Sequence, residues 1–354
     1  MYKNHFCKFV LLILLIVACR QEISHSPLHF TGYEGNPILT PGEPGSWDEL
    51  ALIGPQVYWL DSLYYMFYQG MNQSVKMSVG LATSKNGIDF EKYEGNPILS
   101  PDGEGYDAWL VAGEILLHHD SIWTMYFGAG ELIRYGPGQS IGRATADIIT
   151  GPWIRDEKPV LKTGSIGEWD EGFIYPSSLV QLEDGTFRIY YTGGGDFQRE
   201  LLTHTGIAVS SDGKNWIKYN NPETSQHPFA ESDPVLPLGE KSEWDSYGSW
   251  SSFVYKNHEG YCMYYTGSIF KDGNQECSIG FAWSKDGIDW EKFQDNPIFG
   301  VEDDPYLTTI PERGIIEDSW LVFRDTICYM YYDYGVMVGK IGVATAVLEQ
   351  AADH

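Results

Sequence analysis

The chain has 354 residues, of which 43% are hydrophobic and 20% are charged, as in ordinary globular proteins, and this length allows one large domain or two smaller ones. Its formal net charge of −26 excludes nucleic acid as an expected partner, because an acidic surface repels phosphate backbones. Aromatic residues reach 15%, which favours an all-β fold, since aromatic side chains suit a pleated, half-buried surface.

The first residues predict a targeting segment. Lys3 and Lys8 flank the start of an apolar run, residues 9–18, that is too short to span a bilayer as a helix. The run ends in IVAC (16–19), which resembles a bacterial lipobox. That resemblance implies a lipid on Cys19 and a lipoprotein tethered to a membrane of the bacterial cell envelope. The alternative is an ordinary signal peptide in which the cysteine is a coincidence.

Four short elements recur along the rest of the chain. YEGNPIL occurs at 33–39 and again at 93–99, with looser copies at 158–161, 233–236 and 296–299. The other three elements have these copies: SVGLATS (78–84), SIGRATA (140–146), HTGIAVS (204–210), SIGFAWS (278–284) and KIGVATA (340–346); YMFYQG (65–70), TMYFGA (124–129), RIYYTG (188–193), CMYYTG (262–267) and YMYYDY (329–334); WDE (47–49), YDA (106–108), WDE (169–171), WDS (244–246) and PER (311–313).

The repeats predict a five-bladed β-propeller with four antiparallel strands per blade. Four short strands in each unit of about 60–75 residues are the signature of that architecture. The last unit ends at KIGVATA and lacks its fourth strand, whereas the first YEGNPIL copy is a fourth strand without a unit. We therefore expect residues 30–39 to pair into the last blade and close it. This divides the chain into a signal peptide (1–19), a linker (20–29) and a propeller (30–348).

The repeated acid of the WDE element is expected to cap a turn, because a residue used in every unit is a poor candidate for a catalyst. Its copies are Asp48, Asp107, Asp170, Asp245 and Glu312. Three cysteines remain after Cys7 and Cys19, namely Cys262, Cys277 and Cys328, and we expect them to be free, buried thiols.

The motifs SKNGIDFEKYEGNPIL (84–99) and TGPW (150–153) give the chain a resemblance to the arabinanase–levansucrase–invertase superfamily, which includes glycoside hydrolase families 32, 43 and 130. The resemblance extends over residues 30–346. It implies a monomeric glycosidase without metal or cofactor, acting on a neutral oligo- or polysaccharide where carboxylates of the innermost strands meet at the channel mouth. The superfamily's acid before a proline is missing at Gly54-Pro55 and Tyr175-Pro176. The missing acid makes a non-catalytic glycan-binding lipoprotein the first alternative, and a glycoside phosphorylase like those of family 130 is the second.

Acids that break the repeat are the candidate catalytic residues. Glu114 stands where later units have Ser177 and Ser251, and Asp318 directly precedes the residue that matches Pro55. A register shift of one residue would bring Glu317 inward in place of Asp318. Glu171 is the third candidate, five residues before Pro176 and facing the channel by strand alternation.

Other residues are candidates for substrate binding, each with an alternative. Glu49 matches Glu171 in the first unit, and a loop cap is the alternative role for both. Arg134 and His204, in predicted loops at the channel mouth, are expected to bind sugar hydroxyls, and Trp250, in place of Pro176, is expected to stack on a sugar. Arg313 is a candidate for a phosphate pocket if the protein is a phosphorylase. Each of these polar side chains could instead be solvated, and Trp250 could belong to the core.

Overall fold

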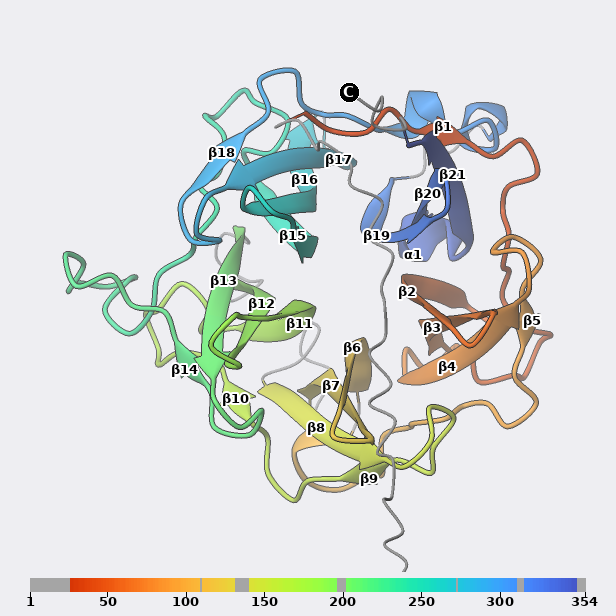
Figure 1. The fold of residues 1–354 in the computed structure, drawn as a ribbon, viewed down its shortest axis with the longest axis horizontal. Coiled ribbons are helices and arrows are strands. Elements are labelled where there is room, and N and C mark those ends of the chain that lie inside the picture. The colour runs from red at the N-terminus through yellow and green to blue at the C-terminus, as the bar shows by residue number, and fades with distance from the viewer. Residues whose placement is uncertain are drawn as a thin grey trace, which may run out of the picture.

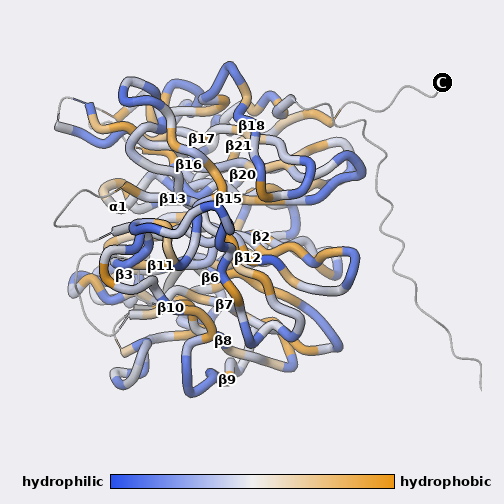
Figure 2. Tube along the Cα trace, turned by 90° about the vertical axis from the view of Figure 1, so that its left-hand side faces the viewer, coloured by the Kyte–Doolittle hydropathy of each residue, from blue (hydrophilic) through white to orange (hydrophobic). Residues whose placement is uncertain are grey.

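The computed structural model describes residues 26–108, 110–130, 140–195, 202–271, 273–310 and 315–348, without the side chains of residues 110, 112–114 and 336. This part of the chain is an all-β structure, as predicted. Figure 1 shows its short sheets arranged around a common centre. In the side view of Figure 2, the peripheral loops are largely hydrophilic. Within the described ranges, no helix is both long and apolar enough to cross a bilayer.

The strands follow one another in antiparallel runs. The first two runs are β2 (Ala51–Leu60), β3 (Leu63–Met71), β4 (Met77–Ser84) and β5 (Glu91–Lys92), then β6 (Leu110–His119), β7 (Ile122–Gly130), β8 (Ser140–Ala146), β9 (Ile154–Arg155) and β10 (Leu161–Lys162). The next two are β11 (Phe173–Gln181), β12 (Phe187–Gly194), β13 (Thr203–Ser210) and β14 (Ile217–Lys218), then β15 (Gly248–Lys256), β16 (Tyr261–Lys271), β17 (Asn274–Ser284) and β18 (Trp290–Lys292). The last is β19 (Glu317–Arg324), β20 (Ile327–Asp333), β21 (Ile341–Val347) and β1 (Thr31–Gly32).

Helical segments are short in the described part of the chain. They are the α-helical turn α1 (Gly335–Val338) and the 3-10 turns η1 (Gly105–Asp107), η2 (Val301–Asp303) and η3 (Leu307–Thr309). Two parallel bridges, Met77 to Leu110 and Thr203 to Gly248, join neighbouring runs. The hydrogen-bonded network therefore consists of three sheets, and the sheet with β19–β21 also contains β1.

The N-terminal segment pairs with the last run, as the repeats predicted. Thr31 of β1 lies opposite Thr345 of β21, and Leu39 forms an antiparallel bridge with Ile341. The two ends of the described chain therefore share one sheet, and β1 covers the outer edge of β21.

The asparagine of the YEGNPIL element explains why the element is repeated. The Oδ1 atom of Asn96 accepts the backbone N–H of Leu81 at 2.8 Å, and its amide donates to the Leu81 carbonyl, also at 2.8 Å. Asn296 makes the same pair of bonds with Phe281, and Asn36 makes it with Val343. Each of these three asparagines thus fastens an outer segment to the third strand of a run, and Asn36 does this between the two ends of the described chain.

Most of the repeated acids are buried and form ion pairs, and they are not simply the turn caps that the sequence predicted. Lys92 Nζ lies 2.6 Å from Asp48, Lys218 Nζ lies 2.6 Å from Asp170, and Lys292 Nζ lies 2.5 Å from Asp245. Arg155 pairs with Asp107 at 2.8 Å. A buried carboxylate needs such a partner because desolvation of its charge is costly.

In the last run, Asp304 and not Glu312 occupies the equivalent position. Its carboxylate accepts hydrogen bonds from the Tyr332 hydroxyl at 2.5 Å and from the Asn36 amide at 2.9 Å. Gly32 stands where the other copies have lysine or arginine, and a Cβ there would come within 2.6 Å of the Asp303 carbonyl oxygen. Glu312 lies outside the described residues. Hydrogen bonds therefore replace the ion pair in the sheet that joins the chain ends.

The expectation of free thiols is confirmed: Cys262, Cys277 and Cys328 are all buried and form no disulfide.

Candidate functional site

A β-bulge interrupts the innermost strand of each run at the same register. The irregularities lie between Ile53 and Gln56, Ala112 and Ile115, Pro176 and Ser178, Trp250 and Phe253, and Glu317 and Trp320. A bulge re-aims the side chains at its position and often marks a functional site in a sheet. At three of these positions the backbone has a positive φ: 61° at Gly54, 31° at Ser251 and 55° at Asp318.

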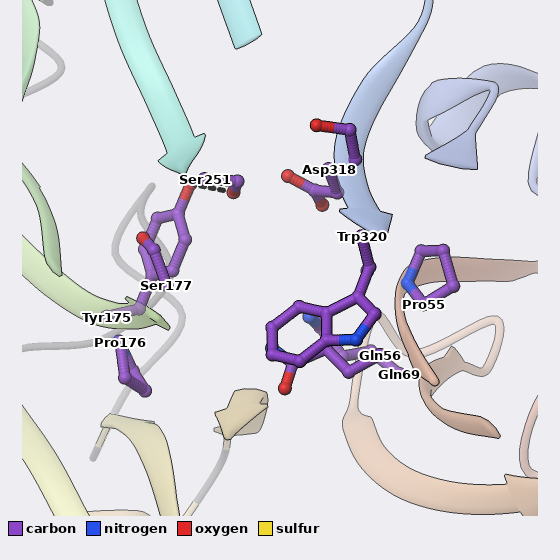
Figure 3. A pocket seen from close by; sticks show the side chains of 11 residues that line it. Pro55, Gln56, Gln69, Tyr175, Pro176, Ser177, Ser251, Asp318 and Trp320 are labelled. Atoms are coloured by element: carbon purple, nitrogen blue, oxygen red, sulfur yellow. Dashed lines mark hydrogen bonds between the residues drawn. The ribbon is translucent and has the colours of Figure 1, made fainter. Parts of the chain in front are cut away.

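Four of the five bulges, those of β2, β11, β15 and β19, contribute to a pocket between the strands (Figure 3). Its lining comes from β2, β3, β11, β15 and β19, so strands distant in the sequence meet there. Gly54, Pro55, Gln56, Gln69, Tyr175, Pro176, Ser177, Ser251, Asp318, Ser319 and Trp320 line it. The pocket is small, with a cavity volume of about 20 Å³, and its lining is both polar and apolar.

Asp318 is the carboxylate of this pocket, and two further acids lie behind it. Its side chain forms hydrogen bonds with Ser251 and Asp333, and its backbone N–H donates to Thr266 Oγ1 at 3.0 Å. Asp333 is fully buried and accepts the backbone N–H groups of Gly54 at 2.8 Å and Gly335 at 2.7 Å. Glu317 interacts with the Cys277 thiol.

Burial raises the pKa of all three carboxyl groups. It brings the pKa of Glu317 to about 8, with a further contribution from the charge of Asp318. Burial also raises the pKa of Asp318, against which the bonds from Ser251 and Asp333 act. The pKa of Asp333 is raised well above its usual range by burial and by the charges of Asp318 and Glu317. The cluster therefore retains protons at neutral pH and can offer both an acid and a carboxylate.

The cluster has no nearby cation among the residues that the structure describes. None of the Lys and Arg ion pairs found there involves Glu317, Asp318 or Asp333. The same ranges contain no group of three His, Cys, Asp or Glu side chains arranged to hold a metal ion. Shared protons and backbone N–H donors thus stabilise these buried acids.

Of the predicted catalytic residues, Asp318 is in the pocket and Glu171 is not part of its lining. The Glu171 carboxylate accepts the Gly167 backbone N–H at 2.5 Å, and Glu49 accepts that of Gly45 at 2.6 Å. Both contacts are within the residue's own loop, which is the capping alternative. Asp318 and Glu317 were predicted as alternatives for the inward-facing acid, but the bulge allows both consecutive acids to join one cluster.

Glu114 belongs to the β6 bulge, but its side chain lies outside the described part of the structure. The strand registers correct its predicted equivalents: the fourth-run match is Ser252 and not Ser251. The other matches are Pro55, Ser177 and Ser319, and all three line the pocket. Arg134, Arg313 and Cys19 also lie outside the described residues.

His204 and Trp250 are placed differently from the predictions. His204 lies on β13 and not in a loop, where its ring meets Trp169 edge-on at 5.7 Å. Burial lowers its pKa to about 4, so this imidazole is neutral at physiological pH. Trp250 matches Tyr175 and not Pro176 in register, and its indole N–H donates to Ser268 Oγ at 3.1 Å. Neither residue is in the pocket lining.

Asp333 and the pair Tyr175–Ser251 are parts of the cluster that the sequence reasoning missed. Asp333 occupies the fifth position of YMYYDY, where other copies of the element have Gln69, Gly128, Thr192 and Thr266. It is thus an acid that breaks the repeat, and this signal was present in the sequence.

Comparison with known proteins finds folds similar to this one among solved glycoside hydrolases. No protein-family model matches the chain, and neither does any curated protein sequence. Solved structures similar to it include a member of the GH130 family of mannoside phosphorylases, which contains glycoside hydrolases that target β-1,2-mannosidic linkages in Candida mannan (17% identity, TM-score 0.69, 93% of this chain and 98% of that one).

Two further solved structures have the same fold. A glycosyl hydrolase from Bacteroides ovatus matches at 16% identity and a TM-score of 0.66, over 90% of this chain and 94% of that one. A thermostable family-43 glycoside hydrolase matches at 17% identity and a TM-score of 0.60, over 86% of this chain and 91% of that one. The resemblance predicted from the motifs is confirmed for the fold.

Proposed function

We propose that this protein is a five-bladed β-propeller glycoside hydrolase that cleaves a neutral oligo- or polysaccharide at the pocket around Asp318. In this proposal each antiparallel run is one blade, and β1 completes the last blade. The observation that carries the proposal is the Asp318 carboxylate in the pocket lining, in a fold similar to those of solved glycoside hydrolases. Glycoside hydrolysis needs an acid that stays protonated and a carboxylate that stays ionised.

The roles within the pocket follow from exposure and hydrogen bonding. Asp318 lines the pocket and can touch a substrate, whereas Asp333 is fully buried and bonded to two backbone N–H groups. We assign Asp318 as the ionised carboxylate and Asp333 as a positioning group behind it. Glu114 is the proposed general acid, because equivalent residues of three other runs line the same pocket.

The test is hydrolysis of a panel of aryl-glycosides and oligosaccharides by Asp318→Asn, Glu114→Gln and Glu171→Gln proteins. Loss of a general acid or base typically lowers the rate 10²–10⁴-fold. We expect losses of this order for the first two variants at an unchanged melting temperature. Glu171→Gln is the matched loop control and should retain activity. Wild-type rates in Asp318→Asn would refute the assignment, and a wild-type protein that binds glycans without cleaving any would establish the binding-protein alternative.

A phosphorylase is the second candidate, supported by the likeness to the GH130 structure. It would transfer the glycosyl group to phosphate, so its rate would depend on phosphate concentration. The acidic chain, with 23 Lys and Arg against 49 Asp and Glu, makes an anion pocket harder to build and favours the hydrolase. Sugar phosphate formed only with added phosphate would reverse this preference.

The proposed location is the bacterial cell envelope, through a lipid on Cys19. The support is the lipobox-like IVAC sequence after an apolar run. An extracytoplasmic site would give the enzyme access to polysaccharides that do not enter the cytoplasm.

A further inference from the structure

Resting on the proposed function, we infer that Ser251 and Tyr175 are positioning residues that form a hydroxyl relay and hold Asp318 in its ionised form. The Tyr175 hydroxyl lies 3.0 Å from Ser251 Oγ, and Ser251 in turn faces the Asp318 carboxylate, whose pKa it lowers as a hydrogen-bonding neighbour. Figure 3 shows the Ser251 hydroxyl between Tyr175 on β11 and the carboxylate on β19. Three separate runs therefore meet at one chain of polar atoms.

The relay has a direction because each hydroxyl carries one proton. When Asp318 is ionised it only accepts, so Ser251 must donate to it. Ser251 Oγ is then left as an acceptor, which the Tyr175 O–H satisfies. Burial and the nearby charge of Asp318 raise the pKa of Tyr175 far above its usual range, so the phenol remains a donor. Protonation of Asp318 removes the need for this donor, and the relay therefore favours the ionised carboxylate.

The backbone around Ser251 fixes the relay in place. The Ser251 backbone N–H donates to Thr192 Oγ1 at 2.8 Å, and Thr192 is fully buried and lies 3.1 Å from Ser177 Oγ. Ser251 itself has a φ of 31°, a left-handed conformation that is sparsely populated for residues other than glycine. Strained backbone of this kind persists where surrounding contacts hold it, as they do here.

The relay makes Asp318 ionise at a lower pH than its neighbouring acids Glu317 and Asp333. The titratable groups around Asp318 are Tyr175 on β11, Cys277 on β17, Asp333 on β20 and the adjacent Glu317. The other elements packed there present the neutral groups Gly54, Gln69 and Thr266. Asp318 alone among the three carboxylates receives the Ser251 hydroxyl, so it is the one expected to ionise first.

The experiment compares the pH profiles of kcat/KM for Ser251→Ala, Tyr175→Phe and the matched control Ser252→Ala. Ser252 is in the same bulge and its buried hydroxyl has no partner among the described residues. Removing the relay should move the acid limb of the profile up by about one pH unit in Ser251→Ala, a tenfold loss on the acid side that recovers at higher pH. Tyr175→Phe should shift the limb in the same direction by less, and Ser252→Ala should leave it in place.

A second readout keeps the inference testable if no glycan is turned over. The lost bond stabilises only the ionised form of Asp318, so the melting-temperature deficit of Ser251→Ala relative to wild type should widen as pH rises through the pKa of Asp318. Absence of turnover in wild type would defeat the proposed function and leave this melting test intact. A deficit independent of pH, or an acid limb that moves no more than in Ser252→Ala, would overturn the relay.

Discussion

Replacing Asn36 by alanine tests whether the N-terminal segment stabilises the whole fold. Its Oδ1 atom accepts the Val343 backbone N–H at 3.0 Å. Its amide nitrogen lies within bonding distance of three acceptors, the Val343 carbonyl at 3.0 Å, Asp304 at 2.9 Å and the Tyr332 hydroxyl at 3.1 Å, and its two protons can bond two of them at once. Asn36 is 8% exposed, so water does not easily replace these partners. At about 1 kcal/mol for each of the three bonds made at once, Asn36→Ala should lower the free energy of unfolding by roughly 3 kcal/mol.

The matched controls are Asn96→Ala and Asn296→Ala, at the same position of later copies. Asn96 makes three such bonds, two with the Leu81 backbone and one with the Tyr68 hydroxyl, all within one antiparallel run. Its loss should cost about 3 kcal/mol by the same reasoning. Neither control removes a bond between the ends of the chain.

Urea unfolding followed by tryptophan fluorescence measures the free energies, and limited chymotrypsin digestion measures release of the segment. Asn36→Ala should be cleaved early near Phe30 and Tyr33, whereas the two controls should protect these sites as wild type does. A loss below about 1 kcal/mol, or equal cleavage in all three variants, would refute the reasoning that Asn36 fastens the chain ends.

Three further outcomes are expected. Lys92→Met should lower the free energy of unfolding by about 1–3 kcal/mol, between the values for surface and buried pairs, because buried Asp48 loses its cation; an unchanged urea midpoint would contradict this. Burial raises the pKa of Glu317 from 4.5 to about 8, so folding favours its protonated form and wild-type stability should decline as pH rises from 4.5 to 8. Glu317→Gln should flatten that decline in melting temperature, and parallel curves would sink the idea. Cys19→Ser should move the protein out of the membrane fraction, and unchanged fractionation would disprove lipidation.

The fold was largely predictable because its repeats are local and self-consistent. The first YEGNPIL copy has no repeat unit before it, and this was enough to predict the pairing of β1 with β21. The same repeats led to a wrong prediction for the role of the acid that follows tryptophan. The acid after tryptophan looked like a turn cap, but its lysine partner lies 44 residues away at Lys92, and no local pattern connects them.

The site was predictable only in part, because bulges change which residues face the centre. A bulge adds a residue to one strand, so strict alternation placed Ser251 where Ser252 belongs and forced a choice between Glu317 and Asp318. Asp333 was accessible to the same repeat-breaking rule that selected Asp318, and was missed because the rule was applied only to the innermost strands.

The pairing of β1 with β21 also sets the order in which the molecule can be completed during synthesis. Asn36 leaves the ribosome early, but its partner Val343 follows 307 positions later, against 15 positions for Asn96 and Leu81. Closing the longer loop costs about 3 kcal/mol more chain entropy. The β1 strand must therefore wait until about 300 further residues have been added, and its sheet with β21 cannot form before then. A nascent chain released before residue 341 would keep β1 exposed to chaperones and to other chains.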